Sequence, residues 1–180
     1  MTAAHFHLLV NHVPILGSAF ALFLLLLSLH PRFGTNVRRA ALVFFVITGL
    51  FSFISVESGE AAHHMIHGAP GILSSNVEAH EEAAETANVF AIITGLAALF
   101  LLVMEWIDRK LPGFVKWVVY LLGIVTFVLM AIAGEKGGLI RHPEVVPGWT
   151  AQSQQMQGEN PADPAEEQEG EMEEEHESTE

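Results

Sequence analysis

The sequence contains no cysteine among its 180 residues. This absence excludes disulfide bonds, thiolate metal sites, cysteine nucleophiles and covalent haem attachment through a Cys-x-x-Cys-His motif. The motifs of a phosphate-binding loop, a nucleophile elbow and a His-Glu-x-x-His zinc protease are also missing. Several common enzyme classes are therefore excluded at the outset.

Charged residues are absent from one part of the chain and have a single sign in another. Residues 8–29 contain no Asp, Glu, Lys or Arg, whereas residues 151–180 contain eleven acidic residues and no Lys or Arg. The whole chain is 51% hydrophobic, yet its formal net charge is −13 at pH 7. This segregation predicts a membrane domain followed by an acidic tail. It also argues against nucleic acid as a partner.

Four segments approach or reach the roughly 20 apolar residues that a helix needs to cross a bilayer. They are residues 8–29, 40–56, 87–107 and 115–133. Backbone in lipid must satisfy its own hydrogen bonds, so each segment is predicted to be helical. The first run is too long for a signal-peptide core and lacks a basic leader, so we interpret it as a retained helix. The predicted fold class is all-α, with a four-helix transmembrane bundle in residues 1–145.

The basic residues predict an orientation in the lipid bilayer. Six of the eight Lys and Arg residues lie in two short connections, residues 30–39 and 108–116. The positive-inside rule places these connections in the cytoplasm. Both termini are then periplasmic, on the outer face of a bacterial inner membrane.

The connection between the second and third spans is predicted to be a helical hairpin. The helical pattern continues to about residue 67, and the Gly- and Pro-containing residues 68–71 end it. Ser75 followed by Glu78 has the pattern of a capping box, which predicts a helix over residues 76–109. Helices two and three should therefore extend beyond the membrane on the periplasmic side.

Residues 146–180 differ in composition from everything before them. Gly, Pro, Gln, Glu and Ser dominate, and large apolar residues are scarce. Such a segment cannot bury enough apolar surface to offset the entropy lost on ordering. We predict a disordered acidic C-terminal tail.

Histidines are numerous and unevenly distributed. Of ten, only His30 lies on the predicted cytoplasmic side. The other nine lie on the periplasmic side together with seven glutamates, and they are His5, His7, His12, His63, His64, His67, His80, His142 and His176. This asymmetry indicates a histidine-rich site at the periplasmic face.

Three of these histidines, from separate helices, are the candidate cofactor ligands: His12, His80 and His142. His12 lies about a turn inside the first span, where a polar side chain is costly against lipid and should face the bundle interior. Gly137 and Gly138 permit a sharp turn, so residues 134–142 can fold back over the bundle and bring His142 to the others. The simpler alternatives are an interfacial hydrogen-bonded histidine and an ordinary exit loop.

A second group of candidates lies along the end of the second helix. Glu57, Glu60 and His64 share one helical face, and Glu60 with His63 forms a Glu-x-x-His pair of the kind used in di-iron bundles. The candidate metal ligands are thus these four residues together with the three histidines above. The alternative is a solvated helix end. His5 and His7 are interpreted as part of a short N-terminal tail with little specificity.

Two kinds of cofactor fit these side chains. Imidazoles on facing helices suit axial ligation of haem b, with an apolar slot offered by Phe20, Phe45, Phe51 and Phe53. Imidazoles combined with carboxylates suit a transition-metal ion such as copper, iron or zinc. Residue spacing does not separate the two.

Several short motifs carry a family resemblance. They are Leu8-Leu-Val-Asn followed by His12-Val-Pro-Ile15, Gly59-Glu-Ala-Ala62, His80-Glu-Glu-Ala-Ala84 and Gly137-Gly138. Over about residues 5–145 the chain resembles a family of bacterial four-helix membrane domains of unassigned function, whose first helix often begins with His-Phe-Pro-Ile. Some members are joined to Rieske or cytochrome-type domains. The resemblance implies that the helices hold a haem or meet a quinone, and that the redox partner of this chain is a separate subunit.

The favoured function is therefore a haem-binding redox or electron-transfer subunit that acts at the periplasmic face. One alternative is a membrane protein that binds a transition-metal ion. Another is a structural assembly subunit without a cofactor. A transporter is less favoured because no charged residue lies deep in any span.

Overall fold

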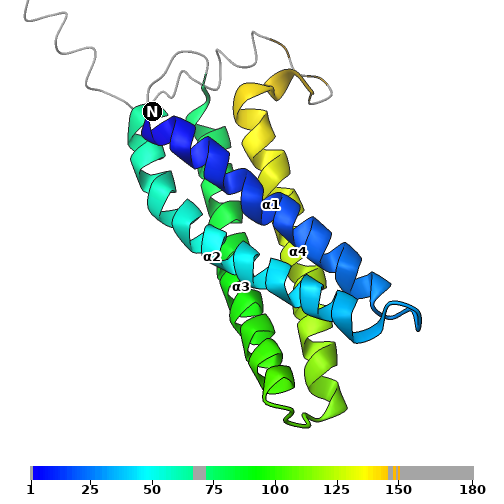
Figure 1. The fold of residues 1–180 in the computed structure, drawn as a ribbon. Coiled ribbons are helices and arrows are strands. Elements are labelled where there is room, and N and C mark those ends of the chain that lie inside the picture. Colours follow the sequence, from blue (N-terminus) through cyan, green and yellow to red (C-terminus); the bar gives the residue numbers. More distant parts are fainter. Residues whose placement is uncertain (1, 67–71, 146–147, 149, 151–180) are drawn as a thin grey trace, which may run out of the picture. The chain divides into compact units, whose positions relative to one another are not determined.

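The computed structural model describes residues 2–66 and 72–145 together with residues 148 and 150, and for residues 3, 4 and 60–66 it describes the backbone alone. These residues form four α-helices and one short 3₁₀ helix, with no strand among them (Figure 1). The elements are α1 (Ala3–Leu27), α2 (Gly34–Ile66), α3 (Ser74–Trp106), α4 (Gly113–Arg141) and η1 (Pro143–Val145). The predicted all-α four-helix fold is confirmed.

The chain divides into two compact units. Residues 1–142 form the helical bundle, and residues 143–180 form the second unit, of which η1 and residues 148 and 150 are described. The predicted end of the second helix at residues 68–71 and nearly all of the predicted tail lie outside the described residues.

The four helices form an antiparallel bundle in which each helix packs against two neighbours. α1 packs against α2 and α4, and α3 packs against the same two, so α1 and α3 are diagonal partners (Figure 1). We call the end with the start of α1, the end of α2, the start of α3 and the end of α4 the histidine end. The opposite end, with the α1–α2 and α3–α4 connections, is the basic end.

The side chains on the outer surface of the bundle indicate whether water or lipid surrounds it. All four helices are long and apolar enough to cross a membrane. Large apolar side chains are exposed on each of them, including Phe23, Leu50, Leu96 and Leu121. A helix bundle in water places polar residues on its outer face, whereas a bilayer favours apolar ones. The chain is therefore an integral membrane protein in contact with lipid.

Two helix boundaries at the histidine end differ from the sequence prediction. α1 begins at Ala3, after an N-cap at Thr2 whose side chain accepts a hydrogen bond from the His5 N–H. The N-terminal residues are therefore helix and not a tail, and Pro14 lies well inside α1. The N-cap of α3 is Leu73, without a side-chain hydrogen bond, so the predicted capping box at Ser75 does not form.

The largest difference concerns the end of α4. Residues 134–141 were expected to turn back over the bundle, but α4 continues as a helix to Arg141. Glycine lowers helix propensity without preventing a helix, and the first residue that blocks continuation is Pro143. Gly137 lies against the His80 ring of α3, so helix packing explains a glycine that local propensity would assign to a turn.

The bundle interior changes character along its length. Towards the basic end it contains an apolar cluster with large members: Ala21, Leu25, Ala41, Leu42, Phe45, Ala98, Leu101, Val119 and Tyr120. Towards the histidine end the apolar cluster is small, with Ala87, Ala91, Met130 and Ala133. Buried hydroxyl and amide side chains lie at the bundle centre and in this half: Ser18, Thr48, Ser52, Ser55, Asn88, Thr94 and Thr126. Large apolar side chains thus pack the interior near the basic end, and buried polar side chains lie at the centre and towards the histidine end.

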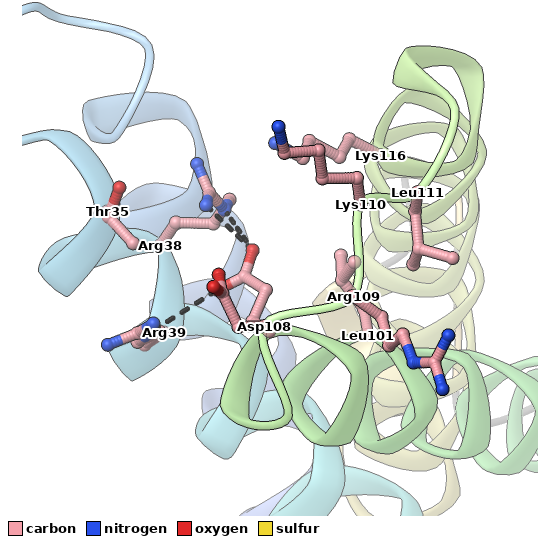
Figure 2. A pocket seen from close by; sticks show the side chains of 10 residues that line it. Thr35, Arg38, Arg39, Leu101, Asp108, Arg109, Lys110, Leu111 and Lys116 are labelled. Atoms are coloured by element: carbon pink, nitrogen blue, oxygen red, sulfur yellow. Dashed lines mark hydrogen bonds and ion pairs between the residues drawn. The ribbon is translucent and has the colours of Figure 1, made fainter.

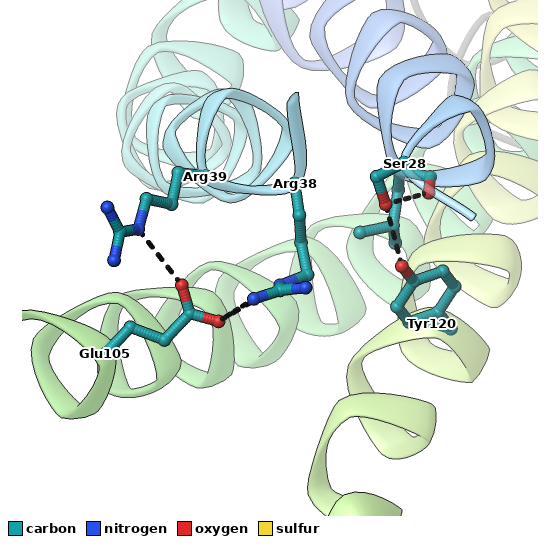
Figure 3. Close-up of polar contacts among 6 residues, drawn as sticks. Ser28, Arg38, Arg39, Glu105 and Tyr120 are labelled. Atoms are coloured by element: carbon teal, nitrogen blue, oxygen red, sulfur yellow. Dashed lines mark hydrogen bonds and ion pairs between the residues drawn. The ribbon is translucent and has the colours of Figure 1, made fainter. Parts of the chain in front are cut away.

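Two groups of polar side-chain contacts join neighbouring helices at the basic end (Figure 3). Arg38 of α2 donates to Glu105 of α3 through Nε at 3.0 Å and Nη2 at 2.7 Å, and Arg39 donates to the second carboxylate oxygen at 3.2 Å. The Ser28 hydroxyl at the end of α1 lies 2.8 Å from the Tyr120 hydroxyl of α4. These contacts join α2 to α3 and α1 to α4 at the basic end.

Candidate functional site

His7 of α1 has a fixed ring orientation at the histidine end. Its Nδ1 lies 3.0 Å from the Ser58 Oγ of α2, and that hydroxyl donates to the Ser55 carbonyl at 3.1 Å. Because the Ser58 proton is used in this way, its oxygen accepts from the His7 Nδ1–H. This tautomer leaves the lone pair of His7 on Nε2. A Cβ added at Gly59 would lie 3.3 Å from Cε1 of the ring, so the glycine permits this close approach.

His80 of α3 is held in the same manner by α4. Its Nδ1 lies 3.0 Å from the Ala133 carbonyl, an atom that can only accept, so Nδ1 carries the proton. A Cβ added at Gly137 would lie 3.0 Å from Cε1 and 3.1 Å from Nδ1 of the ring. The His80 ring therefore rests against the backbone of α4, again with the lone pair on Nε2.

These two histidines lie at the same end of the bundle. His7 and His80 are both half-buried, and a charge on one ring acts on the other. They come from the diagonal helices α1 and α3, while the groups that orient them come from α2 and α4. Each of the four helices thus carries one of these two rings or a group that orients it. Asn76 adds a further tie between α3 and α4, because its side-chain amide donates to the Leu139 carbonyl at 3.0 Å.

The polar interior continues inward from the histidine pair. The Asn11 Oδ1, Thr48 Oγ1 and Ser52 Oγ atoms are buried and have no hydrogen-bond partner among the residues that the structure describes. Thr48 faces α1 closely, because a Cβ on Gly17 would meet its hydroxyl at 2.6 Å. Buried polar atoms of this kind are uncommon in folded proteins and mark places where water or a ligand supplies the missing bond. Between α1 and α2, from His7 towards the bundle centre, these atoms are therefore available to bind water or a ligand.

The predicted ligands are distributed differently from the expectation. His80 lies in the site, whereas His12 is exposed and its Nδ1 bonds to the Leu8 carbonyl of its own helix. His142 is exposed at the C-cap of α4. No group of three or more His, Cys, Asp or Glu side chains that could hold a metal ion occurs within the described part of the chain. His12 lies on an exposed face of α1, and α4 does not turn back to carry His142 over the bundle.

The carboxylate candidates give less information. Glu57 is exposed on α2. Glu60, His63 and His64 belong to the last turns of α2, and their side chains lie outside the described residues. The expected phenylalanine slot does not form, since Phe20 is 58% and Phe53 is 56% exposed on the lipid side, while Phe45 is fully buried against Gly123.

Sequence reasoning missed His7, although a signal for it is present. His7, Asn11, Pro14 and Ser18 follow each other at spacings of four, three and four residues, which places them on one face of a helix. The same spacing recurs in α2 as Thr48, Ser52, Ser55 and Gly59, in α3 as His80, Ala84, Ala87 and Ala91, and in α4 as Thr126, Met130, Ala133 and Gly137. These four stripes of small and polar residues face the interior. His12 lies one position away from its stripe, about 100° around the helix.

Comparison with known proteins yields no matching family model, no matching curated protein and no matching solved structure.

Proposed function

We propose that this integral membrane protein is an electron-transfer subunit that holds a b-type haem at the histidine end, where His7 and His80 would bind it. The observation that carries the proposal is the pair of half-buried histidines on diagonal helices, each fixed through Nδ1 with its lone pair on Nε2. Ligand histidines in proteins are oriented by such a hydrogen bond from the other ring nitrogen.

The number of ligands favours haem over a bare ion. A metal ion bound by protein alone usually takes four or more donor atoms, whereas haem needs at most two from the protein. The structure offers two such imidazoles, with no third His, Cys, Asp or Glu completing a metal group among the described residues. The buried apolar cluster in this half of the bundle contains three alanines, Ala87, Ala91 and Ala133, together with Met130.

The chain's own residues would tune such a centre. A bis-histidine haem supplies one-electron redox chemistry. The Ser58 hydroxyl and the Ala133 carbonyl accept hydrogen bonds from the Nδ1–H groups and so make the Nε2 lone pair of each imidazole a better metal ligand. The lipid-facing apolar surface excludes water laterally. With the basic end in the cytoplasm, as the distribution of Lys and Arg favours, electrons would be exchanged with a separate periplasmic redox subunit or with quinone.

The test is an optical spectrum of the full chain, purified in mild detergent from haem-replete bacterial cells. The wild-type protein should show a Soret band at about one haem per chain, and His7→Ala and His80→Ala should each abolish it. His12→Ala is the matched control, because His12 is exposed and bonds only within its own helix, and it should retain the band. A colourless but fully helical wild-type protein, or a band unaffected in both variants, would refute the proposal.

A transition-metal ion is the second candidate, and one observation favours it. The two Nε2 lone pairs lie at the end of the bundle where α2 continues past Ser58 to Ile66, a segment containing Glu60, His63 and His64. Elemental analysis of the same preparations distinguishes it from haem: copper or zinc in stoichiometric amount, lost in His7→Ala and His80→Ala, would identify this alternative. A colourless, metal-free and fully folded protein would indicate a structural assembly subunit.

A further inference from the structure

A second feature lies at the basic end and is independent of the histidines. A pocket of about 390 Å³ opens between the start of α2, the end of α3 and the start of α4 (Figure 2). Its lining combines five basic and two acidic side chains with three others: Arg38, Arg39, Arg109, Lys110, Lys116, Glu105, Asp108, Thr35, Leu101 and Leu111. The residues come from three separate segments of the chain, so the pocket is a product of the tertiary fold.

The charges in this pocket do not cancel. Glu105 is already engaged by both Arg38 and Arg39. Lys110 and Lys116 extend in the same direction, towards the side of the pocket where α2 lies, whereas Arg109 extends away from Arg38 (Figure 2). The two lysines form no ion pair among the described residues. The pocket thus carries net positive charge with two lysines directed into one region.

Backbone groups add to this field. Thr35 belongs to the first turn of α2, and Lys116 to the first turn of α4. The free N–H groups at a helix N-terminus favour an anion. The N-cap of α4 is Pro112, which makes no side-chain hydrogen bond, so no side chain of this residue competes for those N–H groups. Thr35 and Lys116, each in the first turn of a helix, therefore line the same pocket.

Aromatic residues place the pocket at headgroup depth. Trp106 is 86% exposed and Trp117 64% exposed, and both lie at the basic end close to pocket residues in sequence. Tryptophans are enriched where a membrane protein passes from hydrocarbon to headgroups. Phe114 is exposed in the same region, on the first turn of α4. Exposed aromatic side chains thus neighbour the pocket residues in sequence at this end of the bundle.

We propose that this pocket binds the phosphate-bearing headgroup of an anionic phospholipid from the adjacent leaflet, with Lys110 and Lys116 as its principal contacts. A basic pocket between membrane helices at the headgroup level has the chemistry to recognise such a lipid. Arg38 and Arg39 shape one wall and are kept in place by Glu105. The bound lipid would contact residues of α2 and α4 and of the α3–α4 connection.

The experiment measures lipid binding and thermal unfolding of the full chain in neutral detergent. Phosphatidylglycerol should raise the midpoint temperature, and phosphatidylcholine should not. The double variant Lys110→Gln/Lys116→Gln should bind phosphatidylglycerol about 25-fold more weakly, because each lysine near an anionic lipid contributes roughly a fivefold factor. The double variant Lys110→Arg/Lys116→Arg should retain most of the effect, which separates loss of charge from loss of fold.

Matched controls identify the source of the effect. Lys136→Gln/Arg141→Gln removes the same charge at the histidine end, and Arg32→Gln removes one charge at the basic end outside the pocket. Both should bind phosphatidylglycerol like the wild type. If these controls lose binding as the lysine variant does, general charge attraction explains it and the pocket is refuted. If inorganic phosphate reproduces the whole temperature shift, the site serves a free anion and the lipid assignment is overturned.

Discussion

Gly49 of α2 and Gly95 of α3 face each other at the centre of the bundle. A Cβ on Gly49 would lie 3.2 Å from the Gly95 Cα and 3.0 Å from the Ala91 carbonyl oxygen. The neighbouring atoms are backbone, so they cannot rotate out of the way as a flexible side chain would. Small residues at this point allow the two helices to approach each other at backbone distance, a recurrent basis of helix association in membranes.

Gly49→Ala should therefore separate α2 from α3 and lower the free energy of unfolding by about 1–3 kcal/mol, the usual cost of overpacking. Thermal unfolding in detergent, followed by circular dichroism, measures the change. Gly113→Ala makes the same substitution where nothing lies within 4 Å, and its effect should stay within about 0.5 kcal/mol. Equal midpoints for the two variants would contradict the close approach.

A buried hydroxyl pair joins α3 to α4 near the same level. Thr94 Oγ1 and Thr126 Oγ1 are 2.7 Å apart, and Thr126 donates to the Phe90 carbonyl at 3.3 Å, so Thr94 acts as the donor to Thr126. Thr94→Val keeps the shape and removes this bond. The expected loss is about 0.6 kcal/mol and not more than about 1.7, as for other hydrogen bonds between membrane helices. Thr86→Val is the control, because the Thr86 hydroxyl bonds weakly within its own helix on an exposed face.

The two arginines on Glu105 should differ in their contribution to stability. The Arg38 side chain is 16% exposed and bonds through two nitrogens, whereas the Arg39 side chain is 49% exposed and bonds through one. Arg38→Gln leaves a half-paired carboxylate in a poorly solvated place and should cost about 1.5–3 kcal/mol. Arg39→Gln should cost less than about 1 kcal/mol, as for an exposed ion pair. Reversal of this order in chemical or thermal unfolding would contradict the geometry.

Adjacent glycines in α4 provide a test of the His80 environment. Gly137→Ala places a methyl group about 3.0 Å from the His80 ring, whereas Gly138→Ala places one in open space. Moving the ring breaks its hydrogen bond to the Ala133 carbonyl. Loss of such an orienting hydrogen bond lowers the affinity of a site for its metal by about tenfold or more. Haem or metal content per chain should therefore fall in Gly137→Ala and stay unchanged in Gly138→Ala. Equal content in the two variants would show that the His80 orientation does not control binding.

The membrane character, the four helices and the segregation of charge can be predicted from the amino-acid sequence alone. These follow from apolar runs that need a bilayer and from backbone hydrogen bonds that lipid does not satisfy. Local sequence is less informative about helix ends. Its glycines predict a turn over residues 134–141, and its position in the chain predicts a tail for the N-terminal residues. Both segments are helical, because packing against a neighbouring helix stabilises them.

Which histidines lie near one another depends on how the four helices pack. His7 and His12 are both near the start of α1, but a helix turns about 100° per residue, so their positions differ in face as well as in height. His7 reaches Ser58 and lies near His80, whereas His12 bonds to its own helix. The basic pocket likewise depends on three segments distant in sequence. Sequence period shows which residues share a face of one helix, but the register and packing of four helices determine which faces oppose each other.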